Sequence, residues 1–317
     1  MTEKVALREV GMRDGLQSLS PILTTEQKNA WCAAEFAAGV KEIEVTSFVP
    51  PKLLPMFADA EEVVRHALTL DGLTVSALIP NLRGAERGVA LGVRELAHVL
   101  SVSEGHNQNN VRRSTAESIA DLKGVIELRD SLETGRRVKV MAGLATCFGC
   151  TIEGHVDERR VFTIAAEVLA LKPDALMLAD TVGYGNPAAV RRVFRELLDM
   201  AGELPVGAHF HNTRGLGLAN VLAALEVGVR GFDASLGGLG GCPWAPGATG
   251  NIVMEDTAFM LEAMGFDTGI DLERLIEVRR LVEGFMPGIA FHGDLPKAGI
   301  PKNYVPRLAA RPDQSGA

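Results

Sequence analysis

The chain has few aromatic residues, few cysteines and no concentrated run of positive charge. Aromatic side chains make up 5% of its 317 residues, which disfavours the stacking platforms that bind single-stranded nucleic acid. The formal net charge is −8, and pairs such as Arg159-Arg160 are typical of exposed helix faces, so nucleic acid is not an expected partner. Four cysteines are too few for a disulfide framework and indicate a reducing, cytoplasmic location.

Long hydrophobic runs are also missing. No apolar stretch approaches the roughly 18 residues of a membrane helix, and the first residues show neither a secretory nor a transit pattern. We therefore expect no membrane association. The hydrophobic content of 47% with 23% charged residues is normal for a globular protein with a large core. An acidic chain can still bind an anionic substrate through a locally positive pocket or a metal.

Short β-branched segments alternate with longer segments whose apolar residues recur at helical spacing. The expected strands are residues 5–10, 42–48, 74–79, 95–102, 137–144, 175–180, 206–211 and 231–236. The expected helices are residues 25–38, 82–92, 114–132, 157–171, 187–201, 217–227 and 252–264, with an extra one at 272–286.

Eight strands, each followed by a helix, predict an α/β fold of the (β/α)8 TIM-barrel type, which typically needs about 250 residues. A doubly wound open sheet is the alternative. We expect one barrel domain over residues 1–290, including the additional C-terminal helix, and a tail over residues 291–317. The end of this tail, from Ala309, is expected to be mobile.

Unusual polar residues stand where these strands end, which is where TIM barrels place their active sites. His209 and His211 are separated by one residue, so on a strand both imidazoles point to the same side. With the carboxylate of Asp14 and the amide oxygen of Asn251, they would form a site for Mg²⁺ or Mn²⁺, or for a catalytic Zn²⁺. The alternative is a pair of hydrogen-bonded histidines.

Arg13 is expected to be catalytic. The alternative is an ion pair with Asp14 at the barrel rim, but adjacent strand residues face opposite ways, so we expect Arg13 not to pair with Asp14. Its guanidinium is then free to stabilise an oxygen that gains negative charge during a reaction. Glu44 and Asp180 are predicted to act with it, as partners of Arg13, as supports of the histidines or in direct contact with a substrate.

Cys242 lies in a glycine-rich run, residues 237–247, that lacks the Gly-Lys-Ser/Thr of a phosphate-binding loop. The run predicts a flexible loop that presents a thiol over a pocket, with a buried, inert cysteine as the alternative. Cys147 and Cys150 form a single C-x-x-C, which needs a second pair to bind zinc, and they are expected to be structural.

Several of these motifs together resemble the 3-hydroxy-3-methylglutaryl-CoA lyase family of the wider DRE-TIM metallolyase superfamily. They are Arg-Glu-Val-Gly-Met-Arg-Asp-Gly-Leu-Gln (8–17), Ile-Glu-Val-Thr-Ser-Phe-Val (43–49), Ala-Asp-Thr-Val-Gly (179–183), His-Phe-His-Asn (209–212), Gly-Leu-Ala-Asn (217–220) and Gly-Leu-Gly-Gly-Cys-Pro-Trp-Ala-Pro-Gly-Ala-Thr-Gly-Asn (238–251). The likeness covers roughly residues 4–287. The condensing synthases of the superfamily share His-Phe-His-Asn, but the cysteine-containing run is similar to that of the lyases.

The resemblance implies cleavage of a 3-hydroxyacyl-CoA into acetyl-CoA and a keto acid such as acetoacetate. A divalent cation would be held by the four predicted ligands, Arg13 would face the thioester oxygen, and Cys242 or a group beside it would protonate the enolate. The implied partners are an acyl-CoA substrate and further copies of the chain, as a dimer or tetramer. Four further residues are predicted to bind the substrate: Gln17, Ser47, His106 and Thr181.

Three departures from the family pattern leave the acyl group open. After the fourth strand the chain reads Ser-Val-Ser-Glu-Gly-His-Asn (101–107) where the family would have Ser-x-Ser-Glu-x-Phe. Residues 107–113 are unusually polar, and Trp244 stands where tyrosine is common. Citramalyl-CoA, which would give pyruvate, is therefore an alternative substrate, and an acyl-CoA condensing synthase is an alternative enzyme. A Schiff-base aldolase using Lys139 and a non-catalytic binding protein are less favoured.

Overall fold

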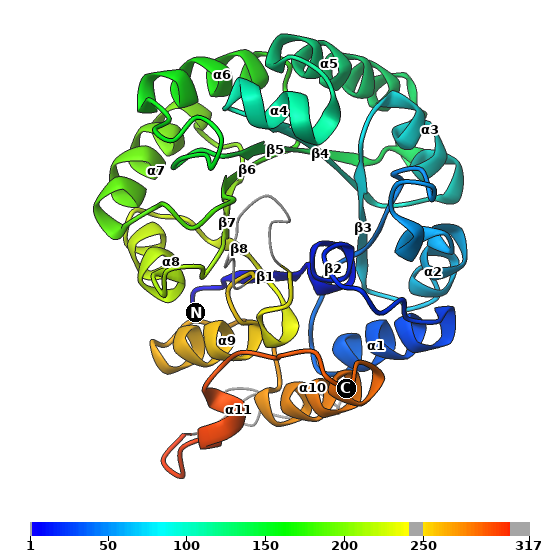
Figure 1. The fold of residues 1–317 in the computed structure, drawn as a ribbon, viewed down its shortest axis with the longest axis vertical. Helices are drawn as coiled ribbons and strands as arrows, with labels where there is room; N and C mark the ends of the chain where they lie inside the picture. Colours follow the sequence, from blue (N-terminus) through cyan, green and yellow to red (C-terminus); the bar gives the residue numbers. More distant parts are fainter. Residues whose placement is uncertain (1, 241–249, 305–317) are drawn as a thin grey trace, which may run out of the picture.

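The computed structural model describes residues 2–240 and 250–304. Eight parallel strands pair in chain order and close between β1 and β8 (Figure 1), which confirms the predicted TIM barrel. The strands are β1 (Ala6–Glu9), β2 (Glu42–Ser47), β3 (Thr74–Ile79), β4 (Glu95–Ser101), β5 (Lys139–Ala145), β6 (Ala175–Asp180), β7 (Val206–Phe210) and β8 (Gly231–Ala234).

All eight expected helices are present, with ends within two residues of those predicted. They are α1 (Thr25–Ala37), α3 (Leu82–Leu91), α5 (Thr115–Ser131), α6 (Glu158–Ala170), α7 (Pro187–Ala201), α8 (Gly217–Glu226), α9 (Met254–Ala263) and α10 (Leu272–Phe285). Three further helices were not predicted from the sequence: α2 (Ala60–Ala67), α4 (Glu104–Val111) and α11 (Leu295–Ala298). Short turns are η1 (Gly11–Gly15), η2 (Pro55–Phe57), η3 (Thr134–Arg136) and η4 (Leu236–Gly238).

The helices surround the strand ring, and α10 and α11 lie outside it beside α1 and α9 (Figure 1). The carboxylate of Asp256 on α9 accepts backbone N–H groups of Asp294 and Leu295 at 2.8–3.0 Å. The first part of the predicted tail is therefore attached to the barrel. The segment from Ala309, predicted to be mobile, lies outside the described residues, and the boundary at residue 290 stays a prediction.

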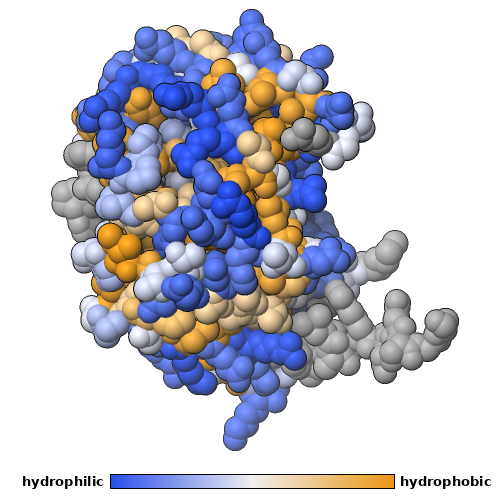
Figure 2. Space-filling model, turned by 90° about the vertical axis from the view of Figure 1, so that its right-hand side faces the viewer, coloured by the Kyte–Doolittle hydropathy of each residue, from blue (hydrophilic) through white to orange (hydrophobic). Residues whose placement is uncertain are grey.

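The surface is mixed, as expected for a ring of amphipathic helices. On the face shown in Figure 2, hydrophilic residues cover much of the surface, with hydrophobic ones in narrower strips between them. Within residues 2–240 and 250–304, no helix is both long and apolar enough to cross a membrane.

The side chains of neighbouring residues of β1 point to opposite faces of the sheet, one into the barrel and one outward, because side chains alternate along a strand. Arg8 points into the barrel, where it meets Asp233 of β8 and Glu95 of β4 at 2.8–3.0 Å. Glu9 points outward and contacts η4. A polar row inside the barrel and a polar cluster outside it therefore begin at the same strand.

The outer cluster contains three buried carboxyl groups, Glu9, Glu35 of α1 and Glu255 of α9. Burial raises the pKa of Glu9 to about 8 and that of Glu255 to about 7. Burial, reinforced by the charge of Glu9, also raises the pKa of Glu35 well above its usual value. Neither oxygen of Glu35 has a hydrogen-bond partner among the described residues. Glu35 is therefore best accommodated as a neutral acid.

We expect the free energy of unfolding to fall as the pH rises from about 4.5 towards about 8. In that range the folded protein binds more protons than the unfolded chain, because the pKa values of Glu9 and Glu35 are raised on folding. Glu35→Gln should reduce this fall and be more stable than the unaltered protein at pH 8. Denaturant unfolding at pH 5 and pH 8 measures both effects, and an unchanged pH dependence would refute the assignment.

Candidate functional site

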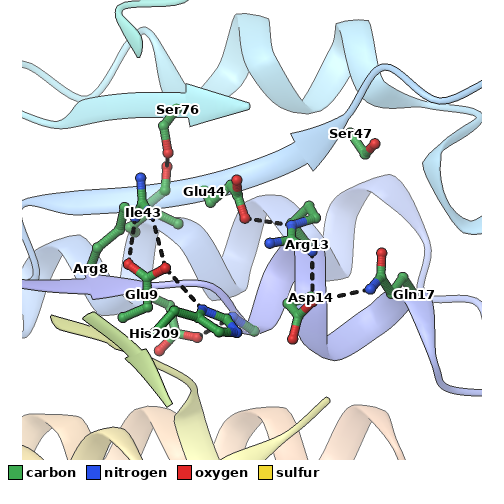
Figure 3. A network of polar contacts seen from close by, with 12 residues as sticks. Arg8, Glu9, Arg13, Asp14, Gln17, Ile43, Glu44, Ser47, Ser76 and His209 are labelled. Carbon is green, nitrogen blue, oxygen red and sulfur yellow. Dashed lines mark hydrogen bonds and ion pairs between the residues drawn. The ribbon is translucent and has the colours of Figure 1, made fainter. Parts of the chain in front are cut away.

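The site begins in η1, the π-helical turn that follows β1 and carries Arg13 and Asp14. Arg13 Nη1 donates to Asp14 Oδ1 at 2.6 Å, and Figure 3 shows the two side chains turned towards each other. The expectation that these adjacent residues do not pair was therefore wrong. It assumed a strand at this point, whereas the turn brings both side chains to one side.

The guanidinium of Arg13 also binds the buried carboxylate of Glu44 through Nε (Figure 3). Glu44 is on β2, so the arginine bridges the ends of two neighbouring strands. Nη2 has no partner among the described residues, which leaves one donor edge of a fixed, buried guanidinium for another molecule. Glu44 is thus a direct partner of Arg13, one of the roles predicted for it.

Three of the four predicted metal ligands offer atoms that all lie within 4.8 Å of one another: Asp14, His209 and His211. The two histidine Nε2 atoms are 3.1 Å apart, and His211 Nε2 is 3.8 Å from Asp14 Oδ2. The fourth residue, Asn251, donates from Nδ2 to the same Asp14 oxygen at 2.7 Å. Its Oδ1 is buried and has no hydrogen-bond partner among the described residues.

This donor set fits a divalent cation. Ligands at right angles, each about 2.1 Å from an ion, are about 3 Å apart, close to the observed separation of the two imidazoles. Burial and then the charge of His209 lower the pKa of His211 to about 4. Although burial opposes it, Arg13 and the histidines lower the pKa of Asp14 to about 2. A neutral imidazole and an ionised carboxylate are the forms that bind metals.

The charges around the site favour a cation as well. The carboxylates of Asp14, Glu44 and Asp233 are buried, and among the described residues the guanidinium groups that they bind are those of Arg8 and Arg13. His209 and His211 lie beside Asp233 and Asp14 and are neutral in the form that binds a metal. This leaves an excess of negative charge in a buried region, where charge is costly unless it is neutralised. Two histidines that merely hydrogen-bond each other, the alternative from the sequence, would not account for this excess or for the unpartnered amide oxygen.

His209 is oriented by residues that the sequence analysis did not identify. Its Nδ1 lies 3.0 Å from Asp233 Oδ2, and Asp233 accepts two hydrogen bonds from Arg8 at 2.8 and 2.9 Å. Burial opposes protonation, but Asp233 outweighs it and raises the pKa of His209. The strand register pairs Arg8 with Asp233 and Asp233 with His209. A charged residue within each of these short apolar strands was the available signal.

Three other predicted residues lie at strand ends with defined partners. Gln17 donates to Asp14 Oδ1 at 3.0 Å (Figure 3). Thr181 accepts the backbone N–H of Thr146 at 2.9 Å, and Ser47 accepts that of Val49 at 3.2 Å. Gln17 therefore contacts a candidate ligand, whereas Ser47 and Thr181 hold backbone N–H groups of loops at the carboxyl ends of the strands. Their roles as substrate contacts remain predictions.

His106 is buried on α4, not solvated in a polar loop. Its Nδ1 is 2.7 Å from the hydroxyl of Ser101, the last residue of β4, and burial lowers its pKa. Ser103 caps α4 by accepting the N–H of His106 at 3.1 Å. Residues 101–107, which depart from the family pattern, therefore form the end of β4 and the start of the helix α4.

Asp180 does not join Arg13. Its two oxygens accept the backbone N–H groups of Tyr184 and Gly185 at 2.8 and 2.9 Å, so it shapes the loop after β6. Burial raises its pKa to about 6. The predicted partnership of Asp180 with Arg13 is not seen among the described contacts, and its predicted catalytic role is untested.

The cysteines and Lys139 are the remaining residues considered in the sequence. Cys147 and Cys150 are buried free thiols, each with a hydrogen-bond partner, as their predicted structural role requires. Cys242 lies outside the described residues. Lys139 is the exposed first residue of β5, at the end of the strand remote from its carboxyl end, which disfavours the Schiff-base alternative.

The comparisons with known proteins agree with this geometry. The model of the HMGL-like family matches residues 4–282. A hydroxymethylglutaryl-CoA lyase of Bacillus subtilis is 40% identical over 281 residues, 89% of this chain and 93% of the relative. An (R)-citramalyl-CoA lyase of Chloroflexus aurantiacus is 38% identical over 286 residues, 86% of this chain and 88% of the relative.

Solved structures of hydroxymethylglutaryl-CoA lyases are also similar to this chain. An HMG-CoA lyase from Acinetobacter baumannii, in complex with coenzyme A and 3-methylmalate, superposes with a TM-score of 0.88 at 41% identity. It covers 96% of this chain and 97% of its own. The carboxyl transferase domain of Rhizobium etli pyruvate carboxylase shares the fold at 17% identity, with a TM-score of 0.68.

We expect Asp233→Asn to weaken Mn²⁺ binding by about 10- to 100-fold, because the imidazole loses the charged group that orients it. Titration of the purified protein with Mn²⁺, followed by electron paramagnetic resonance, measures the affinity. Asp174→Asn is the matched control, since Asp174 also binds an arginine, Arg129, but precedes β6 at the opposite end of the barrel. Equal affinity in Asp233→Asn and the control would contradict this role.

Proposed function

We infer that this chain, which belongs to the HMGL-like family, is a divalent-metal-dependent carbon–carbon lyase. It cleaves 3-hydroxy-3-methylglutaryl-CoA, or a close 3-hydroxyacyl-CoA, to acetyl-CoA and a keto acid such as acetoacetate. The observation that carries this inference is the meeting of Asp14, His209 and His211 beside Arg13 at the carboxyl ends of the strands. Relatives with 34–41% identity over most of the chain are lyases of this kind.

The arrangement suits a retro-Claisen cleavage. A bound divalent cation would polarise the hydroxyl and free carboxylate of the substrate. A histidine of the site, or Asp14 through water, takes the hydroxyl proton. As the C2–C3 bond breaks, its electrons pass to the thioester, and the oxygen that gains charge lies against Arg13.

Arg13 is well prepared for that role. Glu44 and Asp14 hold two of its three nitrogens, so its remaining donor edge keeps its direction before the substrate arrives. Donors that need no reorganisation as charge develops are the ones that lower a barrier most. The last step, protonation of the enolate carbon by Cys242 or a group beside it, is proposed from the family resemblance.

Citramalyl-CoA is the second candidate substrate, and the relative from Chloroflexus aurantiacus favours it at 38% identity. It carries the same hydroxyl, carboxylate and thioester but releases pyruvate. We place the choice between the two at the end of β4, where His106 and Ser101 form a buried polar pair that departs from the family pattern. The condensing synthase remains the alternative in reaction class.

The identity of the ion, the location and the assembly are proposals too. Mg²⁺ or Mn²⁺ suits two imidazoles with carboxylate and amide oxygens, and Zn²⁺ is the alternative. We propose a cytoplasmic homodimer or homotetramer that binds an acyl-CoA. The three described cysteines, all free thiols, support a reducing compartment.

Removal of metal by a chelator should abolish acetyl-CoA release, and Mg²⁺ or Mn²⁺ should restore it. The assay uses 3-hydroxy-3-methylglutaryl-CoA and citramalyl-CoA in parallel, with the keto acid identified by mass. Acetyl-CoA incubated with 2-oxo acids tests the synthase alternative through the appearance of free thiol. Cleavage that persists in fully metal-free protein would exclude the mechanism.

Arg13→Lys should lower kcat by about 10²- to 10³-fold, because a lysine cannot bind Glu44 and Asp14 and still face the substrate. Mn²⁺ affinity should change far less, since Arg13 is not a ligand. Steady-state kinetics of acetyl-CoA release test this, with Arg192→Lys on the exposed face of α7 as the control. A kcat near that of the control would remove Arg13 from the chemistry.

A further inference from the structure

Two carboxylates hold the turn η4, which follows β8. Glu9 of β1 accepts the N–H of Leu236 at 3.0 and 3.2 Å, and Glu255 of α9 accepts the N–H of Gly237 at 2.9 and 3.2 Å. Two consecutive amides of one turn are thus held by acids from two different elements. Each N–H meets both oxygens of its acid, so η4 is fixed from two separate elements, β1 and α9.

The C-terminal segment, whose role the sequence left unexplained, holds the same turn from outside. The N–H of His292 donates to the carbonyl of Gly237 at 2.7 Å. Gly237 has a φ of 60°, and a Cβ there would lie 2.2 Å from the ring of Phe291. Arg279 of α10 lies over this ring and donates to Glu255 at 3.1 Å. Glycine is therefore required by both its backbone angle and its neighbour.

The position of η4 determines how the side-chain amide of Asn251 is oriented. The carbonyl of Leu239, which directly follows η4, accepts from Asn251 Nδ2 at 3.0 Å. The same Nδ2 donates to Asp14 Oδ2 at 2.7 Å. Because both neighbours are acceptors, only the NH₂ end of the amide can face them. Oδ1 is then the atom left for the ion.

Glu9 also contacts the second turn of the site, η1. It accepts the N–H of Gly11, the first residue of η1, which carries Asp14. One carboxylate thus joins the turn that presents Asp14 to the turn that orients Asn251. A shift of η1 would move Asp14, and a shift of η4 would move the Leu239 carbonyl that orients the amide of Asn251.

We propose that Glu9 and Glu255 are positioning residues for the metal site, acting through η1 and η4 on Asp14 and Asn251. This proposal rests on the proposed function only in that the four residues hold a divalent cation. Neither acid contacts a ligand side chain directly. Each sets the backbone from which a ligand is presented or oriented, and metal affinity depends on such outer contacts.

The test is Mn²⁺ affinity in Glu255→Gln and Glu9→Gln, measured on the full-length protein by electron paramagnetic resonance. We expect affinity to fall by about 10- to 100-fold, because an amide NH₂ would be placed against N–H donors. Glu262→Gln is the matched control. Glu262 is another buried acid on α9, but it accepts Thr268 N and Oγ1 at 2.7 Å, away from η4. It should lose stability without losing affinity.

Phe291→Ala keeps the test decisive if the buried substitutions prevent folding. It removes the ring that packs on Gly237 from a half-buried position, and should weaken Mn²⁺ binding several-fold with little change in the melting temperature. Unaltered affinity in folded Glu255→Gln and Phe291→Ala would overturn the proposal. If the unaltered protein itself bound no Mn²⁺, the proposed function would fail instead. Tight binding in all variants leaves the function intact and rejects only the positioning role.

Discussion

Inside the barrel, the carboxylate of Asp233 accepts two hydrogen bonds from Arg8 on one side and meets the imidazole of His209 on the other. All three side chains are buried, and an unpaired charge in such a place costs several kcal/mol. The pairing of β1 with β8 and of β8 with β7 is therefore tied to this row of charges. The register that closes the barrel therefore also orients His209 towards the other candidate ligands.

The same need for neutralisation explains why the site attracts a cation and keeps Arg13 in place. Arg13 is held by Glu44 and Asp14, so its charge is largely used within the protein. A second positive charge is needed beside Asp14, where the two Nε2 atoms converge. Arg13 and the ion would thus lie side by side and share the carboxylate of Asp14, while Glu44 binds Arg13 alone. An anionic acyl-CoA can bind to an acidic protein because Arg13 and a bound cation would place two positive charges side by side at the carboxyl ends of the strands.

The sequence was sufficient for the parts that depend on local pattern. Alternating strands and helices gave the barrel, and His209, His211, Asp14 and Asn251 could be grouped because strand ends of a barrel converge. It was not sufficient for Arg8 and Asp233, which become partners only through the register of β1 and β8. Register depends on barrel closure, which no local pattern specifies.

The errors have local physical causes. The pairing of Arg13 with Asp14 was missed because η1 is a π-helical turn, a rare element with no clear sequence signal. The helix α4 has no amphipathic pattern, since its residues are mostly polar, but Ser103 with Glu104 after it was a usable helix-start signal. His106 belongs to this helix, so its burial could not be inferred from its mostly polar sequence neighbours.

The four ligands fall into two kinds, and this division explains why the acids outside the barrel matter. His209 belongs to β7, and His211 follows it in a bridge with Asn251, so the ladder and Asp233 fix the imidazoles. Asp14 lies on the turn η1, and the amide of Asn251 is oriented by Leu239 after the turn η4, although the backbone of Asn251 is paired with His211. Turns have fewer backbone bonds of their own than a strand has. A metal site needs ligands held to within about 0.5 Å. Turns reach that precision only when outside groups fix them, as Glu9 and the contacts of the C-terminal segment do.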